Sequence, residues 1–223
     1  GYPIWRVEEV RNMIEWIHQY NTSVPNEKKV KFFGFDLQVN HGWKELKYFY
    51  KKVNPEKIAH LDSIKIQLDS ALALSDNSNS QRERTKLFNS VYQQALVVMK
   101  DLILNDAQYQ YISGKEMYDE NFMNIKLIIQ ALESYKDGYN DLRDYYMAQN
   151  IMYLLNQEKP EAKVIVWAHN EHIAKKSKEG FKCMGYHLAN TLKNTYYAVG
   201  FEFYSGSFQT RNVDSNTNSK SQN

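Results

Sequence analysis

Two histidines three residues apart are the clearest candidates for chemistry, in the run Trp167-Ala168-His169-Asn170-Glu171-His172-Ile173. Imidazole transfers protons near neutral pH, and a loop directly after a buried strand is a rigid place from which to aim it. We therefore interpret His169 and His172 as catalytic candidates. The alternatives are that His169 caps the strand and that His172 lies on the exposed side of the next turn. Glu171 is a secondary candidate, as a base or as a neighbour that raises imidazole basicity, although a solvated loop carboxylate is the simpler and preferred interpretation.

Other kinds of reaction centre fit the sequence less well. Helical zinc hydrolases space two histidines four residues apart in His-Glu-x-x-His, whereas the spacing here is three, with no third ligand nearby. We therefore expect neither a metal nor another cofactor. A serine nucleophile is disfavoured because the sequence has no Gly-x-Ser-x-Gly motif. The one cysteine, Cys183, lies in an apolar-leaning segment and is expected to be inert packing.

A polar stripe on the predicted helix around residues 142–151 supplies the next candidates. Arg143, Met147 and Asn150 share one face by the i, i+4, i+7 rule. Removing a guanidinium from water costs several kcal/mol unless it is paired, so an inward-facing Arg143 needs an anionic partner or an oxyanion. The pattern leaves open whether Arg143 forms an internal ion pair or acts in an active site. Asn150 is a secondary candidate.

Hydrophobic periodicity indicates which elements would position these residues. It predicts helices over 5–20, 43–53, 55–75, 81–104, 115–157 with a break near 137–140, and 184–193, and buried strands over 29–36, 162–168 and 196–203. Strands separated by helices predict an α/β fold, a mostly parallel sheet flanked by helices. A large helical insertion at about 43–157 makes this chain helix-dominated. Ligands bind at the carboxyl ends of such strands, so Asp36 and His169 are expected at the same rim.

Composition limits the partners. The chain has 28 Lys and Arg against 26 Asp and Glu, a net charge of +2, which gives no broad field for nucleic acid or membranes. No apolar stretch is long enough to span a bilayer, and we expect a cytoplasmic location. The first residues lack both Met and a signal pattern, which suggests that the sequence begins inside a longer protein. Residues 212–223, rich in Asn and Ser, are predicted to form a disordered tail.

Several segments together resemble the erythromycin esterase family. They are Trp5-x-x-Glu8-Glu9-Val10, Trp16 through Tyr20-Asn21, Phe33-Gly34-Phe35-Asp36-Leu37-Gln38, Arg143-Asp144-x-x-Met147-Ala148-x-Asn150, Trp167-Ala168-His169-Asn170-x-His172-Ile173, Met184-Gly185-x-His187-Leu188 and Gly206-Ser207-Phe208. The resemblance implies that residues 1–211 are the C-terminal portion of such a domain. The family contains metal-independent hydrolases, some of which open the macrolactone ring of macrolide antibiotics and confer resistance. The resemblance also implies that His169, His172 and Arg143 lie at the active-site cleft.

The sequence departs from the family pattern in one important respect. Members carry an upstream Gly-Glu-x-x-His-Gly motif, whose His is the expected base for water, and a further Glu, and neither is in this sequence. The expected partners are therefore the N-terminal part of the same protein and a small-molecule ester, such as a macrolide. Glu171 also fills a slot expected to hold a small residue. Two alternatives remain, a relative that hydrolyses another substrate and a non-catalytic helical interaction module.

Overall fold

The computed structural model describes residues 5–37, 39–74, 78–136, 140–176, 180–202 and 204–205. The chain divides into two compact units, residues 1–36 and 37–223. Each unit is described by itself below. The prediction that residues 1–211 belong to one domain stays a prediction, and the predicted disordered tail lies outside the described residues.

The first unit contains one long helix, α1 (Glu8–Ser23), followed by the short 3-10 turn η2 (Asn26–Lys28). The predicted amphipathic helix is confirmed, with its ends about three residues further along the chain. The Asn21 side chain bonds both backbone groups of Val30, accepting its N–H at 2.8 Å and donating to its carbonyl at 2.9 Å. No residue of α1 is buried, so its apolar side gains little from this unit alone.

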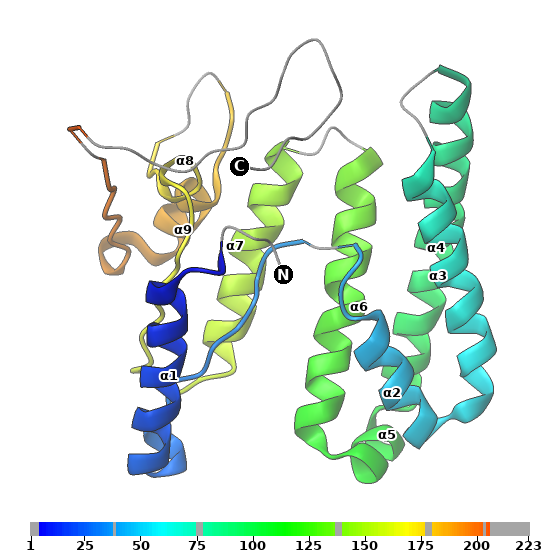
Figure 1. Ribbon diagram of the computed structural model, residues 1–223, viewed down its shortest axis with the longest axis horizontal. Helices are drawn as coiled ribbons and strands as arrows, with labels where there is room; N and C mark the ends of the chain where they lie inside the picture. The colour runs from blue at the N-terminus through cyan, green and yellow to red at the C-terminus, as the bar shows by residue number, and fades with distance from the viewer. Residues whose placement is uncertain are drawn as a thin grey trace. The chain divides into compact units, whose positions relative to one another are not determined.

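The second unit begins with a helical block. Its elements are α2 (Trp43–Val53), η3 (Pro55–Lys57), α3 (Ile58–Ala73), α4 (Ser78–Leu104), α5 (Asp106–Ser113) and α6 (Lys115–Lys136). Helix α6 packs against α2, α4 and α5, and α3 lies along α4 (Figure 1). The predicted helical block is confirmed, whereas α5 was not predicted. Buried Leu and Ile side chains fill the block, with Phe49 edge-on to Tyr50 and Tyr109.

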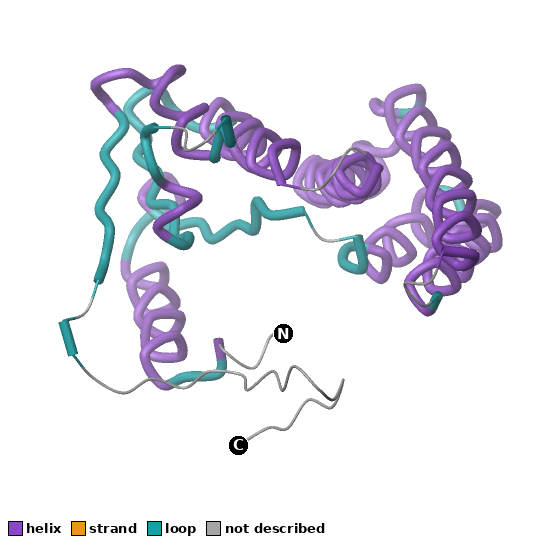
Figure 2. The backbone as a smooth tube through the Cα atoms, turned by 90° about the horizontal axis from the view of Figure 1, so that it is seen from above, coloured by secondary structure: helices purple, strands orange, loops and turns teal. Residues whose placement is uncertain are grey.

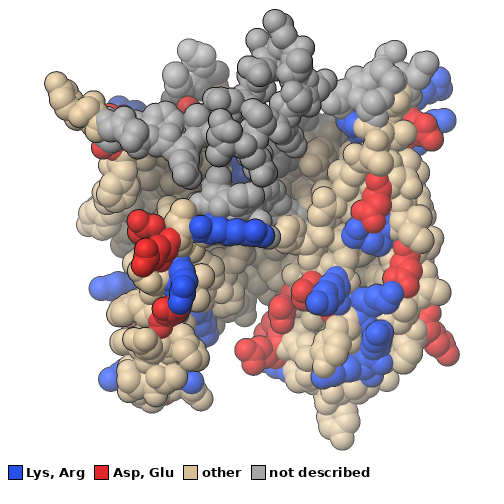
Figure 3. Space-filling view, viewed as in Figure 1, with Lys and Arg blue, Asp and Glu red and all other residues tan. Residues whose placement is uncertain are grey.

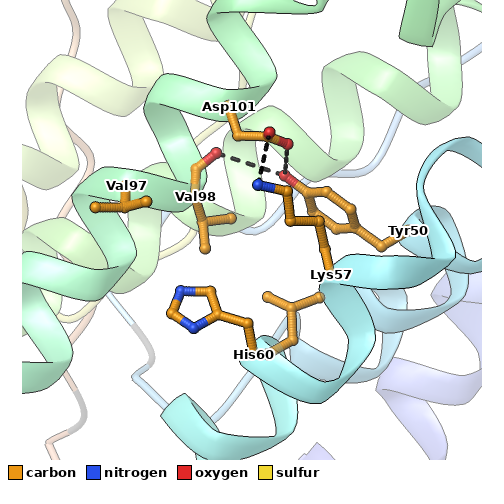
Figure 4. A pocket seen from close by; sticks show the side chains of 7 residues that line it. Tyr50, Lys57, His60, Val97, Val98 and Asp101 are labelled. Carbon is orange, nitrogen blue, oxygen red and sulfur yellow. Dashed lines mark hydrogen bonds and ion pairs between the residues drawn. The ribbon is translucent and has the colours of Figure 1, made fainter.

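A carboxylate of α4, that of Asp101, joins this helix to α2, η3 and α5, and Figure 4 shows its contacts with Tyr50 and Lys57. Asp101 Oδ2 accepts hydrogen bonds from the hydroxyls of Tyr50 at 2.9 Å and Tyr109 at 3.0 Å, and Lys57 Nζ lies 3.2 Å from Oδ1. Burial, and next the charge of Asp101, raise the pKa of Tyr50, which therefore stays a donor. His60 also lines this small pocket, and its buried Nε2 has no hydrogen-bond partner. We interpret the Asp101 cluster as structural.

The rest of the second unit carries the predicted chemistry. It contains α7 (Asn140–Asn156), α8 (Asn170–Ile173), α9 (Met184–Leu192) and the 3-10 turn η4 (Lys193–Thr195). Helix α7 packs against α6 and α9, and α8 packs against α9. The expected division of 115–157 into two helices is confirmed, although residues 137–139 lie outside the described part. The one-turn helix α8 was not predicted.

The predicted parallel sheet is not found among the described residues. The segments predicted as strands over 29–36, 162–168 and 196–203 run as loops, and Phe203 is not described (Figure 2). Phe181 alone is a β-bridge residue in the described part of the chain. A strand needs a neighbour that pairs with its N–H and C=O groups, and the described residues supply no such ladder to these segments. The helix-dominated character is confirmed, and the α/β sheet is not.

The surface mixes charges of both signs. On the face seen in Figure 3, basic and acidic side chains are interspersed among other residues. Within the described residues, no helix combines the length and the apolar character needed to cross a membrane.

Two buried amides join α6 to α7. Asn150 is fully buried, and its Nδ2 donates to Gln130 Oε1 at 2.8 Å while Gln130 Nε2 donates to Asn150 Oδ1 at 3.1 Å. Each amide thus supplies a donor and an acceptor to the other. Asn150, a secondary candidate for the active site, is engaged inside the helix packing.

We predict that Asn150→Ala destabilises the protein by about 1–3 kcal/mol, because the buried amide of Gln130 loses both of these partners. Urea unfolding measured by circular dichroism would give the free energy of unfolding. Gln149→Ala is the matched control, since Gln149 is exposed on the same helix, and it should change stability by less than about 0.5 kcal/mol. Equal effects of the two substitutions would contradict the prediction.

Candidate functional site

A buried carboxylate on α7 organises the candidate site. Asp144 is 1% exposed, and its Oδ1 lies 2.8 Å from His172 Nδ1 and 2.7 Å from the backbone N of Met184. The residue that precedes α9, Cys183, makes no side-chain capping bond. Asp144 therefore caps α9 from a neighbouring helix, where a carboxylate is favoured by the unpaired N–H groups and the helix dipole. One oxygen atom connects α7, α8 and α9.

Arg143 and His172 are brought together by this arrangement. Arg143 Nη1 lies 3.4 Å from His172 Nε2, on the side of the ring opposite Asp144. The side chain of His172 is 25% exposed, so it is held at the edge of the packed region and does not lie on the exposed side of its turn. The structure thus joins two of the three residues predicted to be catalytic.

His169 occupies a different position on the same short helix. It is exposed and is the N-cap residue of α8, where its Nδ1 accepts the Glu171 N–H at 3.3 Å. The ring therefore caps the helix that follows it and not a strand before it, and this bond leaves Nε2 unused. Glu171 is exposed. The catalytic roles of His169 and Glu171 stay predictions.

Two side chains that follow α8 in the sequence hold the backbone at its end. The hydroxyl of Tyr196 donates to the carbonyl of Ile173 at 2.8 Å, and burial raises the pKa of Tyr196, so the hydroxyl stays a donor. Cys183 is buried, as expected of packing, and its Sγ donates to the carbonyl of Ala174 at 2.9 Å. The helix that carries His172 is therefore fixed at its C-terminal end.

The N-terminal end of α8 is fixed by a second asparagine bridge. Asn170 Nδ2 donates to the Phe201 carbonyl at 2.8 Å, and the Phe201 N–H donates to Asn170 Oδ1 at 3.2 Å. Like Asn21 in the first unit, this side chain satisfies both backbone groups of a loop residue, as a neighbouring strand would. It holds the segment after η4 beside the loop that carries His169.

The remaining candidates lie elsewhere. Asp36 is the last residue of the first unit, whereas His169 belongs to the second, so their expected common rim stays a prediction. Asn150 pairs with Gln130. In the described part of the chain, His, Cys, Asp and Glu side chains form no group of three that could bind a metal ion.

Sequence reasoning missed the residue that organises the site. A usable signal was present, because Asp144 belongs with Met147, Ala148 and Ile151 to the i, i+3, i+4, i+7 stripe of α7. All four side chains are buried. An acidic residue on that apolar stripe needs partners.

Comparison with known proteins gives a consistent result. The erythromycin esterase family model matches residues 1–222. Erythromycin esterase type II of Escherichia coli is 26% identical in an alignment that covers 89% of this chain and 53% of that protein. The chain therefore spans about half the length of this curated relative.

Two solved structures share the fold at low identity. A succinoglycan biosynthesis protein matches with a TM-score of 0.67 and 21% identity, over 89% of this chain and 49% of that one. An erythromycin esterase mutant, EreC, in its open conformation matches with a TM-score of 0.59 and 20% identity, over 80% of this chain and 49% of that one. At this identity the likeness shows the fold alone, and in both cases it covers about half of the solved chain.

We predict that Gly185→Ala disturbs the position of α8. A Cβ atom at Gly185 would lie 2.3 Å from the carbonyl carbon and oxygen of Ile173, which follows His172. Backbone would have to move, at a typical cost of about 1–3 kcal/mol. Thermal unfolding should show this loss, and the ring resonances of His172 should shift. Gly34→Ala is the control, because its Cβ would meet nothing within 4 Å; similar behaviour of both variants would refute the prediction.

Proposed function

The chain belongs to the erythromycin esterase family, and we propose that the protein containing it hydrolyses an ester or macrolactone by direct attack of water, without a metal ion. The observation that carries this proposal is the Arg143–His172–Asp144 group, with His169 exposed on the same one-turn helix. A guanidinium held at the edge of the packed region is suited to bind negative charge that develops on an ester oxygen. The substrate we propose is a small-molecule ester, with macrolides as the first candidates.

The mechanism divides proton transfer from charge stabilisation. A histidine outside this sequence, in the family motif Gly-Glu-x-x-His-Gly, takes the proton from water as the water oxygen attacks the carbonyl carbon. The carbonyl oxygen becomes an oxyanion, and Arg143 donates hydrogen bonds to it, a contribution of roughly 3 kcal/mol per well-placed donor. His169 and His172 orient groups around the reacting ester. Collapse of the oxyanion breaks the bond to the alcohol oxygen, which receives the proton.

We also propose that the N-terminal part of the same protein covers two loop segments of the second unit, residues 162–168 and 196–202. Their apolar side chains are exposed, with Ile165 at 97% and Phe201 and Tyr197 each at 82%. Burying one such side chain contributes about 1.5–3 kcal/mol, so leaving several in water is costly. The matching relative and solved structures extend to about twice this length, which supports a family partner for this surface.

We predict that the full-length protein adds one water to erythromycin. Mass spectrometry of the product should show a mass gain of about 18 Da, the mass of one water in an ester hydrolysis. A chelator such as EDTA should leave the rate unchanged if no metal takes part. Loss of activity with the chelator, restored by added metal, would overturn the metal-independent mechanism. No turnover of any ester in a broad panel would favour a binding role.

We predict that Arg143→Ala lowers kcat by about 100-fold or more, the usual effect of removing one oxyanion donor. His169→Ala should also reduce the rate if that residue acts at the reacting ester. The matched control is His41→Ala, since His41 is an exposed histidine of the second unit outside the site. A wild-type rate in both Arg143→Ala and His169→Ala would remove the proposed site.

We predict that the backbone amides of residues 163–166 and 197–200 are protected from hydrogen exchange in the full-length protein. Pairing with strands from the N-terminal part would close their N–H groups in a ladder. Mass-spectrometric exchange should show protection that is absent from the isolated chain of 223 residues. Fast exchange of both segments in the full-length protein would contradict the proposed partner. Exchange in α4 provides the internal reference for folding.

A further inference from the structure

The surroundings of His172 determine which ring nitrogen carries its proton. Nδ1 lies 2.8 Å from Oδ1 of Asp144, and Nε2 lies 3.4 Å from Nη1 of Arg143. A guanidinium has only N–H donors, so Nε2 can bond to it only through its lone pair. A carboxylate only accepts, so Nδ1 must carry the hydrogen. The neutral Nδ1–H tautomer satisfies both neighbours at once, whereas a proton on Nε2 would face the N–H groups of Arg143.

We infer that Asp144 and His172 are positioning residues that hold the guanidinium of Arg143 toward the reacting ester, with His172 as a neutral connector and not a proton acceptor. The inference deepens the proposed function, and the part that concerns the ester rests on it. Asp144 accepts from His172, and His172 accepts from Arg143, so the hydrogen bonds run in one direction from the guanidinium to the buried carboxylate.

The anchor of this chain is well suited to the task. Asp144 is 1% exposed, and the same Oδ1 also accepts the Met184 N–H at the start of α9. The ring of His172 is carried by a helix whose end is held by Tyr196. A long, flexible Arg side chain loses rotamer freedom when it binds an anion. A contact that orders Arg143 before substrate arrives removes part of that cost from the reaction.

A direct consequence is that the two histidines do different work. The lone pair of His172 Nε2 is directed at Arg143, so it is not available to accept a proton from water. The hydrogen bond of His169 is different, because its Nδ1 accepts the Glu171 N–H. This bond does not involve Nε2. Of the two imidazoles, His169 is therefore the one placed to exchange protons with a substrate.

The first test is spectroscopic and needs no substrate. Long-range ¹H–¹⁵N spectra of the full-length protein, with labelled His and Arg, should show His172 with a protonated Nδ1 and an unprotonated Nε2 at neutral pH. The His172 signal is identified by its loss in His172→Gln. In His172→Ala the Nη signals of Arg143 should shift, because Nη1 loses the ring nitrogen that lies 3.4 Å from it. An Nε2–H tautomer, an imidazolium, or an unchanged Arg143 signal would overturn the inference.

The second test is a double-mutant cycle on kcat with the ester that the full-length enzyme hydrolyses. Misplacing a binding group costs about 100-fold, and we expect this loss from His172→Ala in the wild-type background. In the Arg143→Ala background, His172→Ala should change kcat by less than about threefold, because residues that act through one another are not additive. The same fold loss in both backgrounds would show that His172 acts independently of Arg143, which contradicts the inference.

The two tests separate this inference from the proposed function. If no ester is hydrolysed, the proposed function fails, and the spectra still decide the tautomer of His172 and its hold on Arg143. If hydrolysis is found and the cycle is additive, the esterase assignment stands and the positioning role falls. His41→Ala serves both tests as an exposed histidine outside the chain of contacts, and it should leave the His172 signal and kcat unchanged.

Discussion

The buried carboxylate of Asp144 is the contact on which the arrangement of the candidate site depends. An acidic group removed from water is costly unless hydrogen-bond donors replace the lost hydration. The donors come from His172 on α8 and from the backbone of Met184 at the start of α9. The hydrogen bonds of this one side chain thus fix the relative positions of three helices, because moving any of them would leave the buried carboxylate without a donor.

The difference between the helices and the expected sheet follows from where each finds its hydrogen bonds. An α-helix closes its backbone bonds within its own segment, and the block from α2 to α6 also buries its apolar faces within the second unit. A strand obtains its bonds from a neighbour that can be far away in sequence. The segments 162–168 and 196–202 are apolar like central strands, but among the described residues no neighbouring strand pairs with either of them.

Sequence patterns predicted the parts that depend on local periodicity. The boundaries of α2 were predicted to the residue, and the break between α6 and α7 was expected, because the 3.6-residue repeat is read within one segment. Helices α5 and α8 were missed because eight and four residues are too few to show a repeat. The predicted strands depend on pairing between segments, and periodicity alone does not say whether a partner is present.

The candidate site divides in the same way. Arg143 was identified as a polar group on an inward face, a local property of its helix. Asp144, the next residue, is also a charged group on an inward face, and it lies on the buried apolar stripe. Its partner His172 is 28 positions away in the sequence. No spacing rule connects those two residues, because folding alone brings α7 to α8. Local patterns therefore named candidates, and only the fold showed how they are joined.

The spacing of the two histidines places them in different surroundings. Three residues apart on a helix of a single turn, His169 lies at the N-cap and His172 in the last turn. As the N-cap residue, His169 accepts the Glu171 N–H with a ring nitrogen, whereas His172 contacts the carboxylate and the guanidinium of α7. A single turn of helix thus places one imidazole in the exposed loop and the other inside a chain of contacts. The different surroundings of the two rings arise from the contacts that α7 makes with His172, not from the side chain that they share.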